Sequence, residues 1–224
     1  METRVAEPAA GLLQHTSLRD QVLEHVRHAL VSGEIRPGDI YSASALATRL
    51  RVSSSPVREA MLTLVNQGLL EPVRNRGFRV VPMSDRDLDE VYEMRVLLEL
   101  PGTLKAAARI TDADLDRLRA LAGDIEDAAE AGDVVRFLDA DRHFHLDLLA
   151  CGGNGRLVDA VATLRDQTRL YGLENLAERG TLADSAREHR EILAAIADRD
   201  SARLEELVHA HLRHIRADWA QTQD

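Results

Sequence analysis

The hydrophobic periodicity of this chain changes once, at Pro82 and Met83. Before these residues, helix-like stretches are followed by two short apolar runs around a turn. After them, apolar residues recur only at the three- and four-residue spacing of helices. The change predicts two domains, and 224 residues with 45% hydrophobic content are enough for two cores. We expect a mainly α fold, with a flexible arm over residues 1–14, a mixed domain over 15–82 and a helical domain over 83–224.

The mixed domain begins with three predicted helices. Ser17 can cap the first helix, which ends at Gly33, and Ser42 can cap a short second helix. Ser55, followed by a proline at the first helical position, is expected to cap the third helix, which ends at Gly68. Only a tight turn separates the last two helices, so this stretch is predicted to be a helix-turn-helix.

Two short apolar runs follow the third helix, over residues 69–73 and 78–81. The turn between them, residues 74–77, ends in Gly77, where a positive φ is expected. Two strands around a tight turn directly after a helix-turn-helix predict a small β-hairpin wing.

The second domain contains no strand-like alternation. Ser84 and Thr111 each precede an aspartate by three residues, which is typical of helix N-termini, and glycines interrupt the later periodic segments. We therefore predict a bundle of about six helices, over residues 84–109, 111–131, 133–150, 154–178, 182–199 and 201–220.

The charge of the chain is divided between the two domains. The formal net charge is −10, but residues 1–82 contain 10 arginines against 8 acids and residues 83–224 contain 18 basic residues against 30 acids. Within residues 36–82 there are 7 arginines and 3 acids. A basic module on an acidic body is typical of a DNA-binding domain attached to a helical effector domain.

The sequence contains neither an apolar run long enough to span a membrane nor a secretory signal pattern, so we expect a cytoplasmic protein with no membrane partner. Cys151 is the single cysteine. It excludes an internal disulfide and a zinc site built from several cysteines, so a metal would need histidine and carboxylate ligands.

The third helix has the pattern of a DNA-reading helix. Val57 and Leu64 share its inner face, which leaves Arg58 and the preceding serines at its exposed N-terminal end. Arg58 is the best candidate for a base contact because a guanidinium can pair bidentately with guanine, although it can instead pair with Glu59 or an internal carboxylate. The candidate DNA-contacting residues are Arg49, Ser53, Ser54, Ser55, Arg58, Arg74, Arg76 and Arg79.

Four ionisable residues of the second domain lie on helix faces that should be apolar. Asp141 and His145 are four residues apart and share a face. His189 and His211 each lie 11 residues from Asp200, in the turn expected between the last two helices, so an antiparallel hairpin places them at one level. A buried histidine is often a satisfied core residue, but three histidines and a carboxylate are costly to bury without a shared partner. We therefore predict a divalent metal site, with ligands that suit zinc, nickel, manganese or iron.

The first domain resembles the winged helix-turn-helix of GntR-family transcriptional regulators. The resemblance runs from Leu18 to Val81 and rests on Ser32-Gly33 with Pro37-Gly38, on residues 56–60 (Pro-Val-Arg-Glu-Ala), on Gly68-Leu69 and on Arg76-Gly77. It implies binding to double-stranded operator DNA. Where the family commonly has a DNA-contacting arginine this chain has Ser54, and where some members have another it has Ser44. Binding is therefore expected to rest more on Arg58 and the wing, and the usual operator is not assumed.

The second domain resembles the helical, ligand-binding C-terminal domain of the FadR branch of the same family. Its markers are Tyr92 with Arg95 and Glu99, residues 141–145, Gly153-Asn154, residues 188–190 and His211-Leu212. The resemblance implies that Asp141, His145, His189 and His211 bind a metal ion and that a small carboxylate effector completes its coordination. Arg95 can clamp this carboxylate, or it can form a structural ion pair with Glu99, four residues away, or with another core acid.

Two other functions use the same metal site. A metal-dependent hydrolase would activate water there, but the H-E-x-x-H pattern is absent, no motif supplies a general base, and a winged helix has no role in a hydrolase. The metal can also be purely structural. We therefore expect a regulator rather than an enzyme, and a homodimer, since helix-turn-helix proteins usually read two half-sites. The short Pro82-Met83 junction predicts that movement of the helix carrying Arg95 reaches the DNA-binding domain.

Overall fold

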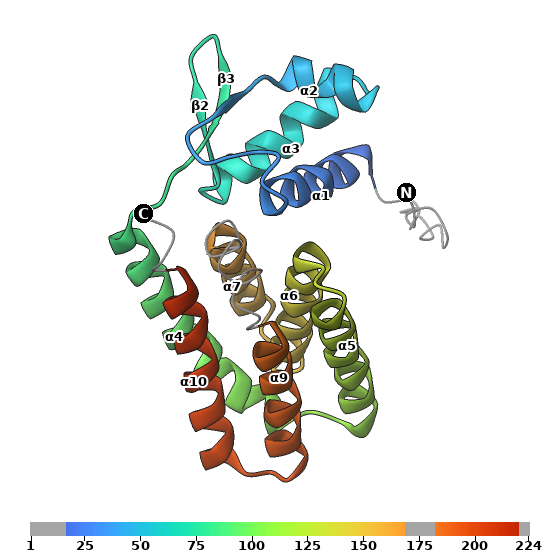
Figure 1. Cartoon of the computed structure of the whole chain (residues 1–224), viewed down its shortest axis with the longest axis vertical. Coiled ribbons are helices and arrows are strands. Elements are labelled where there is room, and N and C mark those ends of the chain that lie inside the picture. Colours follow the sequence, from blue (N-terminus) through green and yellow to red (C-terminus); the bar gives the residue numbers. More distant parts are fainter. Residues whose placement is uncertain (1–16, 169–181, 220–224) are drawn as a thin grey trace, which may run out of the picture.

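The computed structural model describes residues 17–168 and 182–219 of the chain. A winged N-terminal domain rests on one end of a longer helical domain (Figure 1). The arm expected at residues 1–14, and residues 169–178 of the predicted fourth helix of the second domain, lie outside the described residues. No helix within the described ranges is both long and apolar enough to cross a membrane.

The N-terminal domain contains α1 (Leu18–Val31), α2 (Ala43–Leu50) and α3 (Ser54–Asn66). The hydroxyls of Ser17 and Ser42 accept the capping hydrogen bonds of α1 and α2, as the sequence predicts. The prediction of a cap at Ser55 was wrong, because Ser53 is the N-cap of α3. Pro56 therefore lies third in the helix, where its missing N–H costs nothing because first-turn amides have no helical acceptor.

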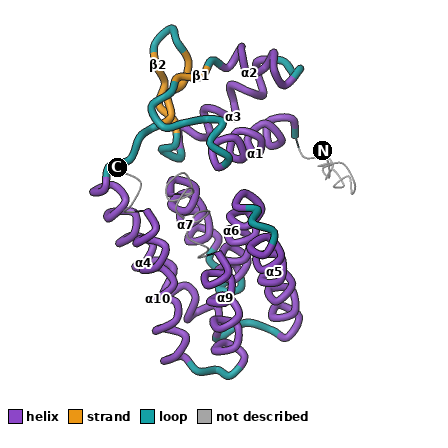
Figure 2. Tube along the Cα trace, in the orientation of Figure 1, coloured by secondary structure: helices purple, strands orange, loops and turns teal. Residues whose placement is uncertain are grey.

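The wing contains one strand more than the sequence predicts. β2 (Leu70–Val73) and β3 (Gly77–Val80) form the expected antiparallel hairpin, and β1 (Ile40–Tyr41) pairs with the other edge of β3, which gives the order β1-β3-β2 (Figure 2). Gly77 has a φ of +127°, and a Cβ there would collide with the carbonyl of Tyr41. Glycine thus allows both the turn and the close approach of β1.

The helical domain begins at Ser84. Ser84 and Thr111 both form complete capping boxes, with Asp87 and Asp114 as their partners. The described helices of this domain are α4 (Asp85–Ala107), α5 (Asp112–Glu130), α6 (Val134–Ala150), α7 (Gly155–Thr168), α9 (Leu182–Ala197) and α10 (Ser201–Trp219).

The core of the helical domain is formed by α5, α6, α9 and α10, with fully buried side chains such as Leu118, Phe144, Ile192 and Leu212. α9 and α10 form an antiparallel hairpin, α5 packs against α6 and α9, and α4 packs against α7 and α10 (Figure 1). This packing directs one face each of α6, α9 and α10 toward a common point inside the bundle.

Candidate metal centre and nucleic-acid interface

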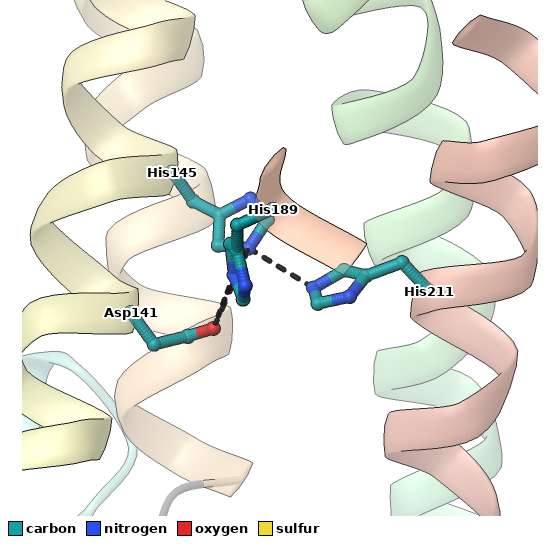
Figure 3. Close-up of side chains that lie close together, drawn as sticks. All are labelled: Asp141, His145, His189 and His211. Atoms are coloured by element: carbon teal, nitrogen blue, oxygen red, sulfur yellow. Dashed lines mark hydrogen bonds and ion pairs between the residues drawn. The ribbon is translucent and has the colours of Figure 1, made fainter. Parts of the chain in front are cut away.

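Asp141, His145, His189 and His211 meet inside the helical domain. α6 supplies Asp141 and His145, α9 supplies His189 and α10 supplies His211, and the side chains point toward one another (Figure 3). One ligand atom from each residue lies within 4.8 Å of the others. The convergence expected from helix faces and from the hairpin is therefore present.

The candidate ligand atoms of the four side chains lie in direct contact with one another. Nε2 of His145 lies 3.1 Å from Nε2 of His189 and 3.0 Å from Nε2 of His211, and Nε2 of His189 lies 3.0 Å from Oδ1 of Asp141. His189 and His211 are 0% and 1% exposed, so water cannot satisfy their nitrogens. The four side chains must satisfy one another or share a partner.

One backbone carbonyl and one side-chain carboxylate determine which ring nitrogens of His189 and His211 carry protons. Nδ1 of His189 lies 2.9 Å from the carbonyl oxygen of Ser185, and Nδ1 of His211 lies 2.7 Å from Oε2 of Glu188. A carbonyl or carboxylate oxygen only accepts, so both Nδ1 atoms donate. In a neutral imidazole the other nitrogen then keeps its lone pair, so Nε2 of both rings is a free ligand atom.

The cluster has too few protons for its acceptors. The lone pairs of His189 and His211 both point at Nε2 of His145, which has at most one proton to donate, and His189 also faces the carboxylate of Asp141. A cation placed among the four atoms satisfies all of them at once. The donor set therefore fits a divalent metal ion, and three imidazoles with one carboxylate suit zinc, nickel, manganese or iron.

The protonation states also favour a metal. Burial lowers the pKa of His145 well below its usual value, and Arg165 acts in the same direction. Burial likewise lowers the pKa of His211. Burial by itself would raise the pKa of Asp141, but the neighbouring His145 and the charged Arg165 hold it well below its usual value. Neutral imidazoles and an ionised carboxylate are the forms that bind a metal.

A buried chain of charged residues leads away from the cluster. Nη1 of Arg165, on α7, donates to Oδ2 of Asp141 at 3.0 Å, and Nε of Arg165 donates to Glu99 at 3.1 Å. Nε of Arg95 donates to the other oxygen of Glu99 at 2.6 Å. The ion pair of Arg95 with Glu99, which the sequence left open beside a role in effector binding, is therefore present. Burial by itself would raise the pKa of Glu99, but Arg165 and Arg95 lower it to about 2.

The N-terminal end of α3 and the wing enclose a groove of about 930 Å³. Five of the residues predicted to contact DNA line it, together with Ser42, Ser44 and Asn75, which the prediction did not include. The five are Ser54, Ser55, Arg58, Arg74 and Arg76. Within residues 17–168 and 182–219, Arg58 forms no ion pair, and Glu59 accepts a hydrogen bond from Ser55 instead.

The other three candidate residues lie outside the groove lining. Arg49 pairs with Glu34 at 2.8 Å and Arg79 pairs with Glu71 at 3.0 Å, and all four side chains are at least two-fifths exposed. Ser53 is the N-cap of α3, and its hydroxyl makes no capping hydrogen bond. Exposed ion pairs of this kind are weak, so both arginines can exchange a carboxylate for a phosphate.

Residues 18–80 match the family described as bacterial regulatory proteins of the gntR family, and residues 90–214 match the FCD domain. The chain belongs to the GntR family. Its helix-turn-helix and its FCD domain together cover both halves of the described structure, and the two-part fold expected from the sequence is confirmed.

Individual GntR-family proteins are similar to this chain over different lengths. McbR of Escherichia coli K12 is 34% identical over 139 residues, which are 62% of this chain and only 63% of McbR. LutR of Bacillus subtilis 168 is 31% identical over 210 residues, which are 82% of this chain and 93% of LutR. The solved structure of E. coli McbR superposes with a TM-score of 0.84 and 27% identity, and covers 94% of this chain and all of that chain.

These relatives are transcriptional regulators, and GntR-family proteins are DNA-binding regulators rather than enzymes. The hydrolase alternative therefore has no support from these relatives.

Sequence reasoning about this GntR-family chain missed Arg165 and the role of Glu188. The only signal for Arg165 was an arginine four residues after Val161, on what proves to be the buried face of α7.

Proposed function

We propose that this GntR-family regulator binds operator DNA as a homodimer and that a small carboxylate bound at the metal centre changes its operator affinity. The observation that carries the proposal is the convergence of histidine lone pairs and one carboxylate oxygen in the FCD domain, without enough protons to satisfy them. Such a set of atoms is built to hold a cation.

The groove between α3 and the wing is the proposed DNA-binding face. Arg58 lines this groove and is proposed to read a base, most simply guanine. The wing arginines Arg74, Arg76 and Arg79, with Arg49 and the serines 53–55, are proposed to contact phosphates, which fix the position of the domain without reading sequence. Two copies of this domain in a homodimer would read two half-sites.

Asp141, His145, His189 and His211 would hold the metal ion. When bound, the ion would supply a Lewis-acidic position that accepts an oxygen of a small carboxylate, provided its coordination exceeds four. Arg95 and Arg165 both donate to the carboxylate of Glu99, which supports a role of these guanidiniums in binding a carboxylate. The effector is proposed to engage Arg95 in the same way.

A ligand regulates DNA binding only if it has different affinities for the DNA-bound and DNA-free forms. Typical couplings correspond to changes in operator affinity of about 5- to 150-fold. We expect the effector to release the regulator from DNA. By reciprocity, operator DNA then weakens effector binding by the same factor.

The test is a titration of operator binding against a panel of small carboxylates. The operator fragment is first selected from a random DNA pool by the wild-type protein. The titration is repeated with metal-stripped protein, with Arg95→Ala, and with Arg86→Ala as the matched control, since Arg86 lies on the same helix in an exposed pair with Glu90.

Loss of the effect after metal removal and in Arg95→Ala, with Arg86→Ala unchanged, supports the proposal. A carboxylate that binds the metal centre tightly and leaves operator affinity unchanged at saturation would contradict it. The metal would then have a structural role.

A further inference from the structure

The far end of α7 touches the DNA-binding domain. Nη2 of Arg27, on α1, lies 3.4 Å from Oδ2 of Asp166, and Nε2 of Gln167 donates a 2.8 Å hydrogen bond to the backbone carbonyl of Gln67. A Cβ placed on Gly68 would lie 2.8 Å from Nε2 of Gln167, so the two domains are closely packed at this point. In Figure 1, α7 ends directly below α1 and α3.

Asp166 is held between the two domains by two arginines. Arg142, on α6, donates to both of its oxygens at 2.7 and 3.2 Å, and Arg27 approaches from the DNA-binding domain. The Asp166 side chain is only 2% exposed, and those of Arg27 and Arg142 are 13% and 17% exposed. Ion pairs withdrawn from water in this way are screened little and are sensitive to loss of one partner.

The residues that hold this contact lie next in the sequence to Asp141 of the candidate metal centre and to Arg165, which binds Asp141. On α7, Arg165 donates to Asp141 while the next residue, Asp166, contacts Arg27. On α6, Asp141 belongs to the cluster while the next residue, Arg142, holds Asp166. Consecutive residues on a helix move together, so a rotation or shift of α6 or α7 changes both contacts at once.

We propose that Asp166 and Gln167 form a latch that docks the winged domain onto the FCD domain, and that Arg165 and Arg142 connect this latch to the metal centre. The latch is a second link between the domains, besides the Pro82-Met83 junction. Its role in regulation rests on the proposed sensor function, whereas its role in docking does not. The two roles are therefore tested separately.

The variants are chosen so that the carboxylate of Asp166 never loses all its partners. Arg27→Gln removes the interdomain ion pair with Asp166, but Arg142 still binds Asp166 through two hydrogen bonds. Gln167→Ala removes the other interdomain hydrogen bond. Arg19→Gln is the matched control, because it removes the same charge from the same helix, and Arg19 donates to Asp20 and Thr63 within the DNA-binding domain.

Docking is measured by hydrogen exchange in the full-length, zinc-loaded protein. The amides of Gly68 and Leu69, which donate to the carbonyls of Val65 and Leu64, lie at the latch. Their exchange should accelerate at least about tenfold in Arg27→Gln and in Gln167→Ala, as expected for loss of a hydrogen bond involving a charged or buried group. Arg19→Gln should exchange like wild type. Unchanged rates in both latch variants would overturn the proposal.

Coupling is measured as the ratio of operator affinities with and without bound zinc, on DNA selected by the wild-type protein. If the latch connects the centre to the winged domain, both latch variants should bring this ratio toward one while binding the same amount of zinc, and Arg19→Gln should keep the wild-type ratio. Wild-type ratios in both latch variants would overturn the connection. A wild-type ratio of one would also overturn the connection, because zinc at the centre would then have no effect for the latch to transmit. The carboxylate titration would still test the proposed function, and the exchange experiment would test the docking role.

Discussion

Nδ1 of His211 donates a hydrogen bond to Oε2 of Glu188 across 2.7 Å, from the buried face of α10 to the half-buried carboxylate on α9. Burial by itself would raise the pKa of Glu188, but this hydrogen bond holds it below its usual value, so the carboxylate is ionised. The contact fixes the tautomer of His211 and turns Nε2 toward the cluster. A carboxylate behind a histidine also makes the imidazole a better metal ligand.

Replacement of Glu188 by glutamine should weaken metal binding by about 10- to 100-fold, because the variant lacks the negative charge that holds the ring and increases its basicity. Zinc affinity, measured by competition with a chromophoric chelator, tests this. Glu191→Gln is the control, since Glu191 is exposed on the same helix. Equal affinities of the two variants would show that Glu188 does not support the site.

Replacement of His211 by alanine should reduce both metal content and thermal stability. Metal analysis of the wild type should find about one ion per chain. A metal that binds only the folded state adds about 2.7 kcal/mol to the free energy of unfolding when its free concentration is 100 times its Kd. His209→Ala is the control, because His209 is exposed on the same helix. Full metal content in a His189→Ala/His211→Ala double variant would refute the ligand assignment.

Replacement of Arg58 by alanine should cost about 1–3 kcal/mol of binding to the selected operator and little on random DNA, because a base contact carries sequence information. Arg76→Ala should weaken binding to both DNAs and flatten the salt dependence, as expected for a phosphate contact. Binding isotherms at several salt concentrations separate the two effects. Similar losses on both DNAs for Arg58→Ala would assign Arg58 to the backbone.

The buried carboxylate of Glu99 should make folding stability dependent on pH. Its pKa in the folded protein is lowered from 4.5 to about 2. The carboxylate therefore stabilises the fold fully above its pKa in the unfolded chain, and this stabilisation is lost as the pH falls through its pKa in the folded protein. Glu99→Gln breaks a buried ion-pair chain and should cost about 3–5 kcal/mol at neutral pH. Urea unfolding from about pH 7 to pH 3 should show this difference shrinking below about pH 4.5, because the unfolded chain there takes up a proton that the folded carboxylate, with its pKa of about 2, does not.

Glu90→Gln provides the comparison for Glu99. Glu90 lies on the same helix in an exposed pair with Arg86, so its replacement should have a small effect. If the stability difference between wild type and Glu99→Gln stays constant over the whole pH range, Glu99 does not titrate as described.

Local patterns in the sequence determined most of the architecture. The caps at Ser17, Ser84 and Thr111 and the periodicity of the helices depend only on residues within a few positions, so they are readable without a structure. The convergence of His189 and His211 could also be predicted from the sequence, because both lie the same number of residues from the turn that joins their two helices. The start of α3 was placed two residues too late, since Pro56 is acceptable at more than one position of a first turn.

Apart from His189 and His211, which one hairpin relates, only the tertiary structure decided which remote side chains meet. β1 is two residues long and exists because β3 offers it an edge, which no pattern in Ile40 and Tyr41 reveals. Likewise, Arg165 reaches Asp141 and Asp166 reaches Arg27 across distances in the chain of 24 and 139 residues. The sequence specifies which face of a helix is buried because that periodicity is local, whereas an ion pair depends on where two independently placed helices bring the ends of long side chains.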